Sequence, residues 1–179
     1  MIFKLFYKIV NRIKYNYRRR VFKMKTNTNH NNFTLHGDCY LFNTNVKVGN
    51  NVHIYPGVTF WGDGYIEIGD NCSIGNGTII FASKNGGVVI GNSTHIAAQC
   101  YIIDMDHGIE LGRLIQEQNN LVEKIVIGSD VWIAAGAKIL KGSILSDHSV
   151  IGANAVVKGE IPLNAVAVGI PARIIKYRS

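Results

Sequence analysis

Cysteine, acidic residues at the N-terminus and long apolar runs are all scarce or absent in this sequence. Its three cysteines, Cys39, Cys72 and Cys100, stand too far apart to match the spacing of a zinc site, so we expect reduced, structural thiols. No apolar run approaches the roughly 20 residues that a transmembrane helix needs. Lys4 and Lys8 interrupt the place where a signal peptide would have its hydrophobic segment. These absences favour a cytoplasmic protein.

Acidic residues are missing altogether from residues 1–25, which hold nine of the nineteen Lys and Arg residues. The rest of the chain is close to neutral. In this arm, apolar residues recur at the spacing of one helical face, at Ile2, Phe6, Ile9, Ile13 and Tyr17. We predict a basic amphipathic helix that either lies peripherally on an anionic membrane surface or packs on protein. Nucleic acid is not an expected partner, because the body offers no basic face to extend the arm.

Beyond residue 45, aliphatic or aromatic residues recur every six positions in five groups of three. The groups are Val48, Ile54 and Phe60; Ile68, Ile74 and Ile80; Ile90, Ile96 and Ile102; Ile127, Ile133 and Ile139; and Leu145, Ile151 and Val157. A period of six fits neither a helix nor a simple alternating strand, but it fits a short strand followed by a turn. Three such units close one coil of a parallel β-helix. We predict an all-β fold of about five coils over residues 46–162, with a lead-in segment at 26–45 and a tail at 163–179.

The six-residue spacing widens after Phe60, after Ile80 and after Ile102, where two, four and nineteen extra residues are inserted. Each insertion falls between the third position of one group and the first position of the next. If the groups are coils, all three insertions leave from the same edge of the prism. They would form a wall beside a flat face, and a wall beside a face makes a cleft. The longest insertion predicts a protruding loop over residues 104–124.

The most specific part of the sequence runs from Ile125 to Lys176 and includes "IVIGSDVWIAAGAKI" and "VAVGIPARIIK". On these motifs the chain resembles the hexapeptide-repeat acyltransferases, closest to the sugar and polysaccharide O-acetyltransferases of the galactoside and maltose type. The resemblance covers about residues 46–176. It implies a left-handed β-helix and a homotrimer with active sites between subunits. It also implies acetyl-CoA as co-substrate and no required metal.

The resemblance also implies the site residues. It places the catalytic base at His107, just before the protruding loop, and a histidine can remove the proton from a hydroxyl at neutral pH. Asp104, Asp106 or a backbone carbonyl could orient the imidazole, and we prefer Asp104. Asn76 and Asp106 are candidates for binding the acceptor. By position in the family, contacts with acetyl-CoA fall on Trp132, Ala135, Ala153, Lys158, Gly159, Arg173 and Lys176.

The predicted function is transfer of an acetyl group from acetyl-CoA to a hydroxyl of a sugar or glycan, in surface polysaccharide biosynthesis. Three alternatives stay open. One is transfer to the nitrogen of an amino sugar, since a protonated amine also needs a base. Another is a non-catalytic β-helix scaffold subunit. The last is a zinc enzyme on the same fold, like the γ-class carbonic anhydrases, which needs three histidine ligands, although the loop after His107 contains no further histidine. We expect His53 and His95 to be structural and His148 to lie at an exposed corner.

Overall fold

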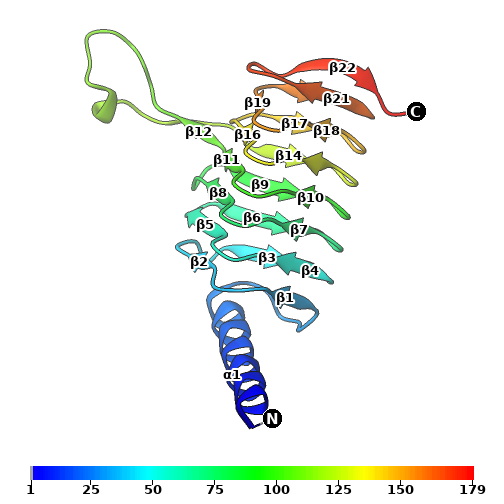
Figure 1. The fold of residues 1–179 in the computed structure, drawn as a ribbon. Coiled ribbons are helices and arrows are strands. Elements are labelled where there is room, and N and C mark those ends of the chain that lie inside the picture. Colours follow the sequence, from blue (N-terminus) through cyan, green and yellow to red (C-terminus); the bar gives the residue numbers. More distant parts are fainter. Residues whose placement is uncertain (1) are drawn as a thin grey trace.

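The computed structural model describes residues 2–179 and shows one helix followed by a column of stacked strands (Figure 1). Three parallel sheets form the three faces of a prism, here called sheets A, B and C. Sheet A contains, in spatial order, β1 (Phe33–Leu35), β4 (Val52–Ile54), β7 (Ser73–Ile74), β10 (His95–Ile96), β15 (Trp132–Ile133), β18 (Val150–Ile151), β21 (Ala165–Val168) and β22 (Arg173–Tyr177). Only its last pairing, β21 with β22, is antiparallel.

Sheets B and C have six strands each. Sheet B contains β2 (Tyr40–Leu41), β5 (Thr59–Gly62), β8 (Ile79–Ala82), β11 (Tyr101–Ile103), β16 (Lys138–Ile139) and β19 (Val156–Val157). Sheet C contains β3 (Val46–Val48), β6 (Tyr65–Ile68), β9 (Gly87–Ile90), β14 (Ile125–Ile127), β17 (Ile144–Leu145) and β20 (Glu160–Ile161). A small hairpin of β12 (Met105–Asp106) and β13 (Leu121–Val122) and the 3₁₀ turn η1 (Ile115–Glu117) stand apart from the prism.

The core is a set of aliphatic columns that run along the prism axis. In sheet A, the inward residues Ile54, Ile74, Ile96, Ile133 and Ile151 lie directly above one another in register. All of them are at most 2 % exposed. Neighbouring strands of a sheet lie about 4.8 Å apart, so each aliphatic side chain packs against its equivalents in the coils above and below. This confirms that the six-residue period marks the inward positions.

The prism is longer than predicted, with about seven turns rather than five. The segment 26–45, expected to be a lead-in, contains β1 and β2, which pair in parallel with β4 and β5. The tail at 163–179 contains β21 and β22. The first coil has one extra residue in its B-to-C connection, and the last hexad is shortened, so both ends depart from the strict spacing.

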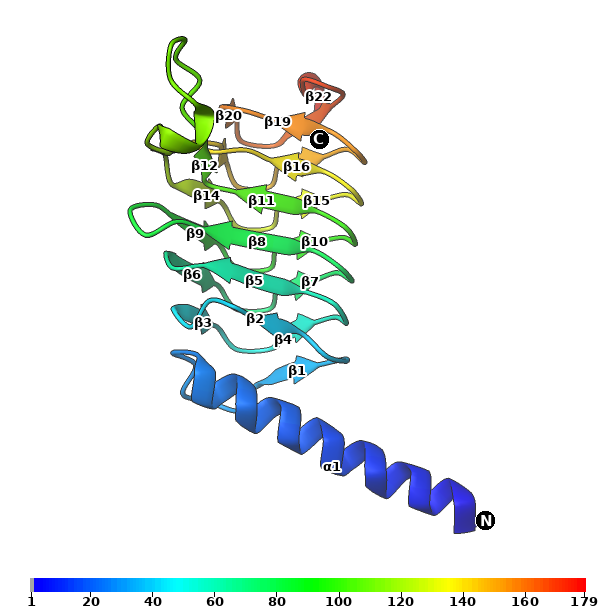
Figure 2. The same ribbon diagram turned by 90° about the vertical axis from the view of Figure 1, so that its left-hand side faces the viewer.

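All three predicted insertions leave from the same edge of the prism, as expected. They connect β5 to β6, β8 to β9 and β11 to β14, and each of these connections passes from sheet B to sheet C. We call this the loop edge. Figures 1 and 2 show the longest insertion extending away from the column on this side. The corners that lead into sheet A turn on residues with positive φ, among them Asn71, Asp130 and His148, so His148 lies at a corner as predicted.

Helix α1 (Ile2–Lys25) joins the first coil through its C-terminal end only (Figure 2). Phe22 is 1 % exposed and packs against Phe33 and Phe60, with ring centroids 5.2 and 6.2 Å away. An ion pair joins Arg18 to Asp38. Farther toward the N-terminus, the apolar stripe is uncovered, with exposed fractions from 50 to 86 % at Phe3, Leu5, Phe6, Tyr7, Ile9, Ile13 and Tyr17. No helix among residues 2–179 is long and apolar enough to span a bilayer.

Truncating one inward residue tests the column packing. Ile102→Ala removes a side chain that is fully buried, so we expect the free energy of unfolding in urea to fall by about 2–5 kcal/mol. Ile144→Ala is the matched control, because this isoleucine is 45 % exposed on the outer side of sheet C, and its loss should cost less than about 1 kcal/mol. Equal losses in the two variants would contradict the assignment of inward and outward positions.

Candidate active site

His107 follows strand β12 at the point where the chain leaves the prism, and its side chain is exposed. Strand β12 pairs antiparallel with β13, so that Met105 lies opposite Val122 and Asp106 opposite Leu121. Continued by one residue, this register sets His107 opposite Asn120. The histidine therefore stands at the base of the protruding loop, on a two-stranded ribbon rather than on a free loop. The ribbon limits where its imidazole can lie.

Asp104 has a different task from the one that the sequence suggested. Its carboxylate is fully buried and accepts hydrogen bonds from the backbone N–H of Ser83 to both oxygens, each at 2.9 Å. The hydroxyl of Ser83 and the backbone N–H of Gly87 also donate to it, each at 2.7 Å. These bonds hold the turn between β8 and β9. The preferred role of Asp104 as the orienter of His107 stays a prediction, and in this structure its oxygens face the β8–β9 turn.

The turn held by Asp104 requires a glycine beside the carboxylate. A Cβ at Gly86 would collide with the side-chain oxygen of Asp104 and with Val122. The close approach explains why "NGG" stands in this insertion. It also means that the second insertion and the base of the long loop are packed together as one unit.

Lys141 closes the base of the loop from the coil above. Its ammonium lies 2.7 Å from the carboxylate of Glu123 and 3.9 Å from that of Asp106, and its side chain is only 10 % exposed. The hydrogen bond with Lys141 lowers the pKa of Glu123, and the same bond raises the pKa of Lys141. The pair therefore stays charged across neutral pH. Asp106 is engaged here, on the side of the ribbon that faces Lys141.

The predicted cleft between the wall and the flat face is present. Its lining comes from all three insertions and from the outer side of sheet B. The residues are Asp63, Phe81, Ser83, Lys84, Asn85, Met105, Asn119, Asn120 and Val122. We call this the wall groove. Sequence reasoning located the groove through the insertions but did not select these side chains, because the six-residue spacing says nothing about which inserted residues turn inward.

The residues expected to contact acetyl-CoA lie in three places on one chain. Ala135 and Ala153 are exposed at successive corners between sheets A and B, and the backbone N–H of Asn154 donates to the backbone carbonyl of Ala135 at 2.9 Å. Trp132 is 54 % exposed on sheet A and lines a hollow there together with Lys176. We call the edge between sheets A and B the alanine edge.

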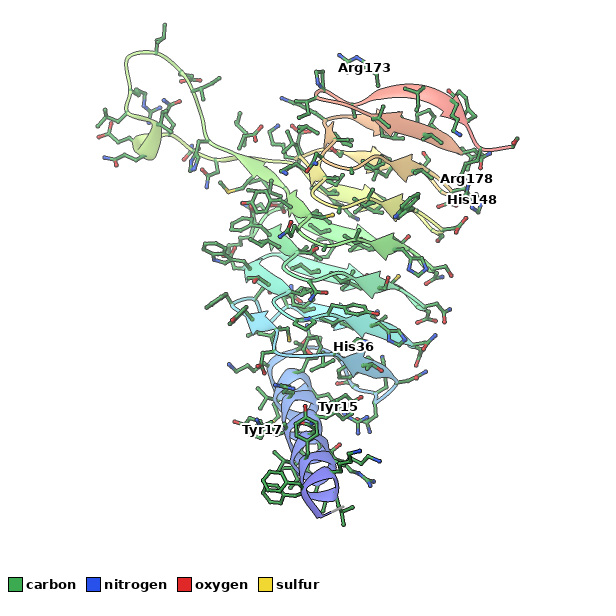
Figure 3. The ribbon with its side chains drawn as sticks, in the orientation of Figure 1. Tyr15, Tyr17, His36, His148, Arg173 and Arg178 are labelled. Atoms are coloured by element: carbon green, nitrogen blue, oxygen red, sulfur yellow. The ribbon has the colours of Figure 1, made fainter. Side chains whose placement is uncertain are left out.

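The third place is at the C-terminal end of the prism. Lys158 and Arg173 line a shared hollow there, and Gly159 follows Lys158 at a corner with φ of 96°. Figure 3 shows Arg173 at this end of the column, whereas Arg178 and His148 lie together at another edge. Asn76 lies at the alanine edge, where its backbone carbonyl accepts from the backbone N–H of Gln99 at 2.8 Å. One chain therefore does not bring Asn76 or the alanine corners to His107, because the width of sheet B separates the two edges.

The remaining histidines bond to neighbours on the outside of the prism. Nε2 of His36 lies 3.0 Å from Nδ1 of His53, and Nδ1 of His95 lies 2.7 Å from the hydroxyl of Ser73. Within residues 2–179, no group of three or more His, Cys, Asp or Glu side chains is arranged to hold a metal ion. The three cysteines are all free thiols, as expected.

A prism of stacked hexapeptides whose longest insertion carries a histidine defines a class, the hexapeptide-repeat transferases. Residues 124–159 match the family model described as bacterial transferase hexapeptide (six repeats). The chain is 34 % identical over 149 residues to the putative lipopolysaccharide biosynthesis O-acetyl transferase WbbJ of Escherichia coli, covering 77 % of this chain and 75 % of that protein. This chain belongs to the hexapeptide-repeat transferase family.

Two further comparisons show how far the likeness extends. A probable acetyltransferase of Mycobacterium tuberculosis is 33 % identical over 135 residues, which are 74 % of this chain but only 44 % of that protein. A solved structure of AntD, an N-acyltransferase from Bacillus cereus in complex with dTDP-4-amino-4,6-dideoxyglucose and coenzyme A, superimposes with a TM-score of 0.78. It is 20 % identical and covers 89 % of this chain and 88 % of that chain, so it supports the fold.

Replacing Asp104 tests its structural task. In Asp104→Asn, one oxygen becomes an amide donor that faces the N–H groups of Ser83 and Gly87, so we expect the free energy of unfolding to fall by about 1–3 kcal/mol. Hydrogen exchange should accelerate at both amides. The matched control is Asp106→Asn, two residues away and partly exposed, which should leave exchange at Ser83 and Gly87 unchanged. Equal exchange in Asp104→Asn and the unsubstituted protein would refute the assignment.

Proposed function

We propose that this protein transfers an acetyl group from acetyl-CoA to a hydroxyl of a sugar or glycan, with His107 as the general base. The observation that carries the proposal is the position of His107, which is exposed on the ribbon beside the wall groove. The likeness to WbbJ supports both the acyl chemistry and a surface polysaccharide as the setting. The coenzyme A in the AntD complex supports a thioester donor on this fold.

The chemistry is an addition to the thioester carbonyl followed by loss of the thiol. His107 accepts the proton of the acceptor hydroxyl as its oxygen forms a bond to the acetyl carbon. The carbon–sulfur bond then breaks, and the imidazolium returns the proton to the departing sulfur of coenzyme A. Because Asp104 is occupied by the Ser83–Gly87 turn, the second ring nitrogen needs another partner. A backbone carbonyl or a group from a neighbouring subunit meets this need.

A homotrimer supplies the missing half of the site. In a cyclic trimer, each interface joins two different patches of the same chain. The loop edge with His107 and the alanine edge with Ala135 and Ala153 are two such patches. The loop also presents exposed apolar residues, with Ile109 and Leu111 80 and 99 % exposed, which a neighbouring subunit would cover. The active site would then lie between subunits, and the three groups of expected acetyl-CoA contacts would belong to two chains.

Transfer to the nitrogen of an amino sugar is the second candidate. The observation that favours it is the fold-level likeness to AntD, which is described as an N-acyltransferase. The same base would remove a proton from the sugar ammonium before the nitrogen attacks, or from the amine nitrogen as its bond to the acetyl carbon forms. O-transfer remains the first choice, because the relative with the more extensive sequence likeness, WbbJ, is described as an O-acetyl transferase. Comparing a sugar with the corresponding amino sugar as acceptor separates the two.

His107→Ala should lower acetyl-CoA turnover with a sugar or glycan acceptor by at least about 100-fold, because the loss of a general base typically costs about 10²–10⁴-fold. The thermal unfolding midpoint should stay unchanged, since the side chain is exposed. His36→Ala is the control, because His36 is an exposed histidine on the first coil. Near-normal turnover of His107→Ala would remove the histidine from the mechanism.

We also propose that α1 holds the protein on an anionic membrane surface. The support is the uncovered apolar stripe on a segment that carries nine cations and no acid. In the trimer, three such helices would extend from the same end of the molecule and add their affinities. The enzyme would then sit beside glycans that are assembled on lipids.

The arm is tested without removing Phe22, because that side chain belongs to the core. Phe6→Ser combined with Ile13→Ser should abolish sedimentation with vesicles that contain about one third anionic lipid, while the free energy of unfolding stays the same. Tyr55→Ser is the control for a general loss of exposed apolar area, since Tyr55 is 37 % exposed on the prism. If the double variant sediments with the vesicles as the unsubstituted protein does, the arm packs on protein instead.

A further inference from the structure

The outer side of sheet B carries a file of aromatic rings below the protruding loop. Phe42 packs against Trp61 with ring centroids 6.3 Å apart, and Trp61 packs against Phe81 at 5.9 Å. Tyr40 extends the file beside Phe42 at 6.5 Å. The rings come from three successive coils, since Trp61 lies opposite Phe81 in register. We call these four residues the aromatic column.

Three rings of the aromatic column are largely exposed and adjoin one another. Phe42, Trp61 and Tyr40 are 67, 52 and 54 % exposed, although the six-residue repeat needs no large ring at these outward positions. Contiguous exposed apolar surface commonly marks a binding site. Aromatic faces are well suited to the flat, weakly polar C–H faces of pyranose rings.

The aromatic column leads into the wall groove. Phe81 is the last ring of the column and also lines the groove. Its register neighbour in the next coil is Ile103, which ends strand β11 just before Asp104. From there the chain enters the ribbon that carries His107. Besides Ser83, which bonds to Asp104, the polar groups along the groove are an acid, a cation and three amides, from Asp63, Lys84, Asn85, Asn119 and Asn120. Such groups hydrogen-bond to sugar hydroxyls.

We propose that the aromatic column and the wall groove bind an extended glycan, several sugar residues long, whose acetylated residue lies at His107. This inference rests on the proposed function and narrows it from a sugar to an oligosaccharide or polysaccharide chain. The rings of successive coils lie 6.3 and 5.9 Å apart, which is comparable to the advance of one pyranose ring along a glycan. Successive rings of the column can therefore stack on successive sugars. The column begins in the first coil, against which α1 packs. The glycan would therefore run from the helical arm toward His107.

A second copy of the chain is the competing occupant of this surface. The observations favour the glycan, because the rings form a single file whose upper end lies among charged and amide side chains. A subunit interface buries a wider patch with an apolar centre. The oligomeric state of the column variants distinguishes the two occupants.

The test is calorimetric titration with pyranose oligosaccharides of one to six residues, taken from malto-, galacto- and chito-series and from fragments of acidic bacterial polysaccharides, without acetyl-CoA. We expect at least one series to bind at least about tenfold more tightly at four residues than at one. Trp61→Ala and Phe42→Ala should remove this gain. Ile144→Ala, an exposed residue on sheet C, should retain it. All three variants should elute as the same oligomer as the unsubstituted protein.

Three results would overturn the proposal. The first is an affinity independent of chain length in every series. The second is dissociation of the oligomer in Trp61→Ala, which would make the column a subunit interface. The third is tight binding of a nucleotide sugar that depends on Trp61, which would make the rings a stacking site for a base.

Repeating the titration with His107→Ala separates this proposal from the proposed function. Suppose that this variant binds longer glycans more tightly, but the unsubstituted protein transfers no acetyl group to the bound glycan. The proposed enzyme activity would then be contradicted, and the proposed glycan-binding surface would be supported. If the protein instead acetylates a monosaccharide and longer acceptors bind no more tightly, the proposed enzyme activity would be supported and the glycan-binding surface contradicted.

Discussion

Everything in this molecule depends on the in-register stacking of inward aliphatic side chains along the prism axis. Each isoleucine of sheet A must lie above the isoleucine of the previous coil, because a shift by one residue would turn it outward. The strands and their inward residues are therefore fixed in place. Extra residues can leave only where the chain turns a corner, and in this chain the long ones leave at the loop edge. The scaffold thus decides where a site can be built.

The sequence predicted the scaffold well, because stacking requires an inward aliphatic residue at every sixth position, and this period can be read directly from the sequence. The fold class, the inward positions and the common edge of the insertions were all confirmed. The number of coils was underestimated at both ends. At the first coil, Leu35 and Leu41 keep the period of six, but one extra residue separates Leu41 from Val48. At the last coil, Ile161 pairs with Leu145, although it follows the inward Val157 by four positions, two fewer than the repeat.

The candidate site was predictable in position but not in its contacts. The break in the repeat after Ile102 placed His107 at the base of a protruding loop. The structure gives Asp104 partners other than His107, and the reason is physical. In an extended strand, residues two apart share a face, so a residue that follows the inward Ile102 by two also points inward. Its burial is then compensated by hydrogen bonds from Ser83 and Gly87. Which inserted residues would face the groove depends on turns that carry no period.

We propose that one prism holds only half of the site, with His107 on the loop edge and the alanine corners on the alanine edge. Mixing two inactive variants measures this directly. His107→Ala lacks the base, and Ala153→Trp blocks the alanine edge. If each site joins the loop edge of one subunit to the alanine edge of the next, trimers reassembled from equal amounts should regain about a quarter of the unsubstituted acetyl transfer activity, because that fraction of interfaces has both intact edges. Activity no higher than that of the separate variants would show that both halves belong to the same chain.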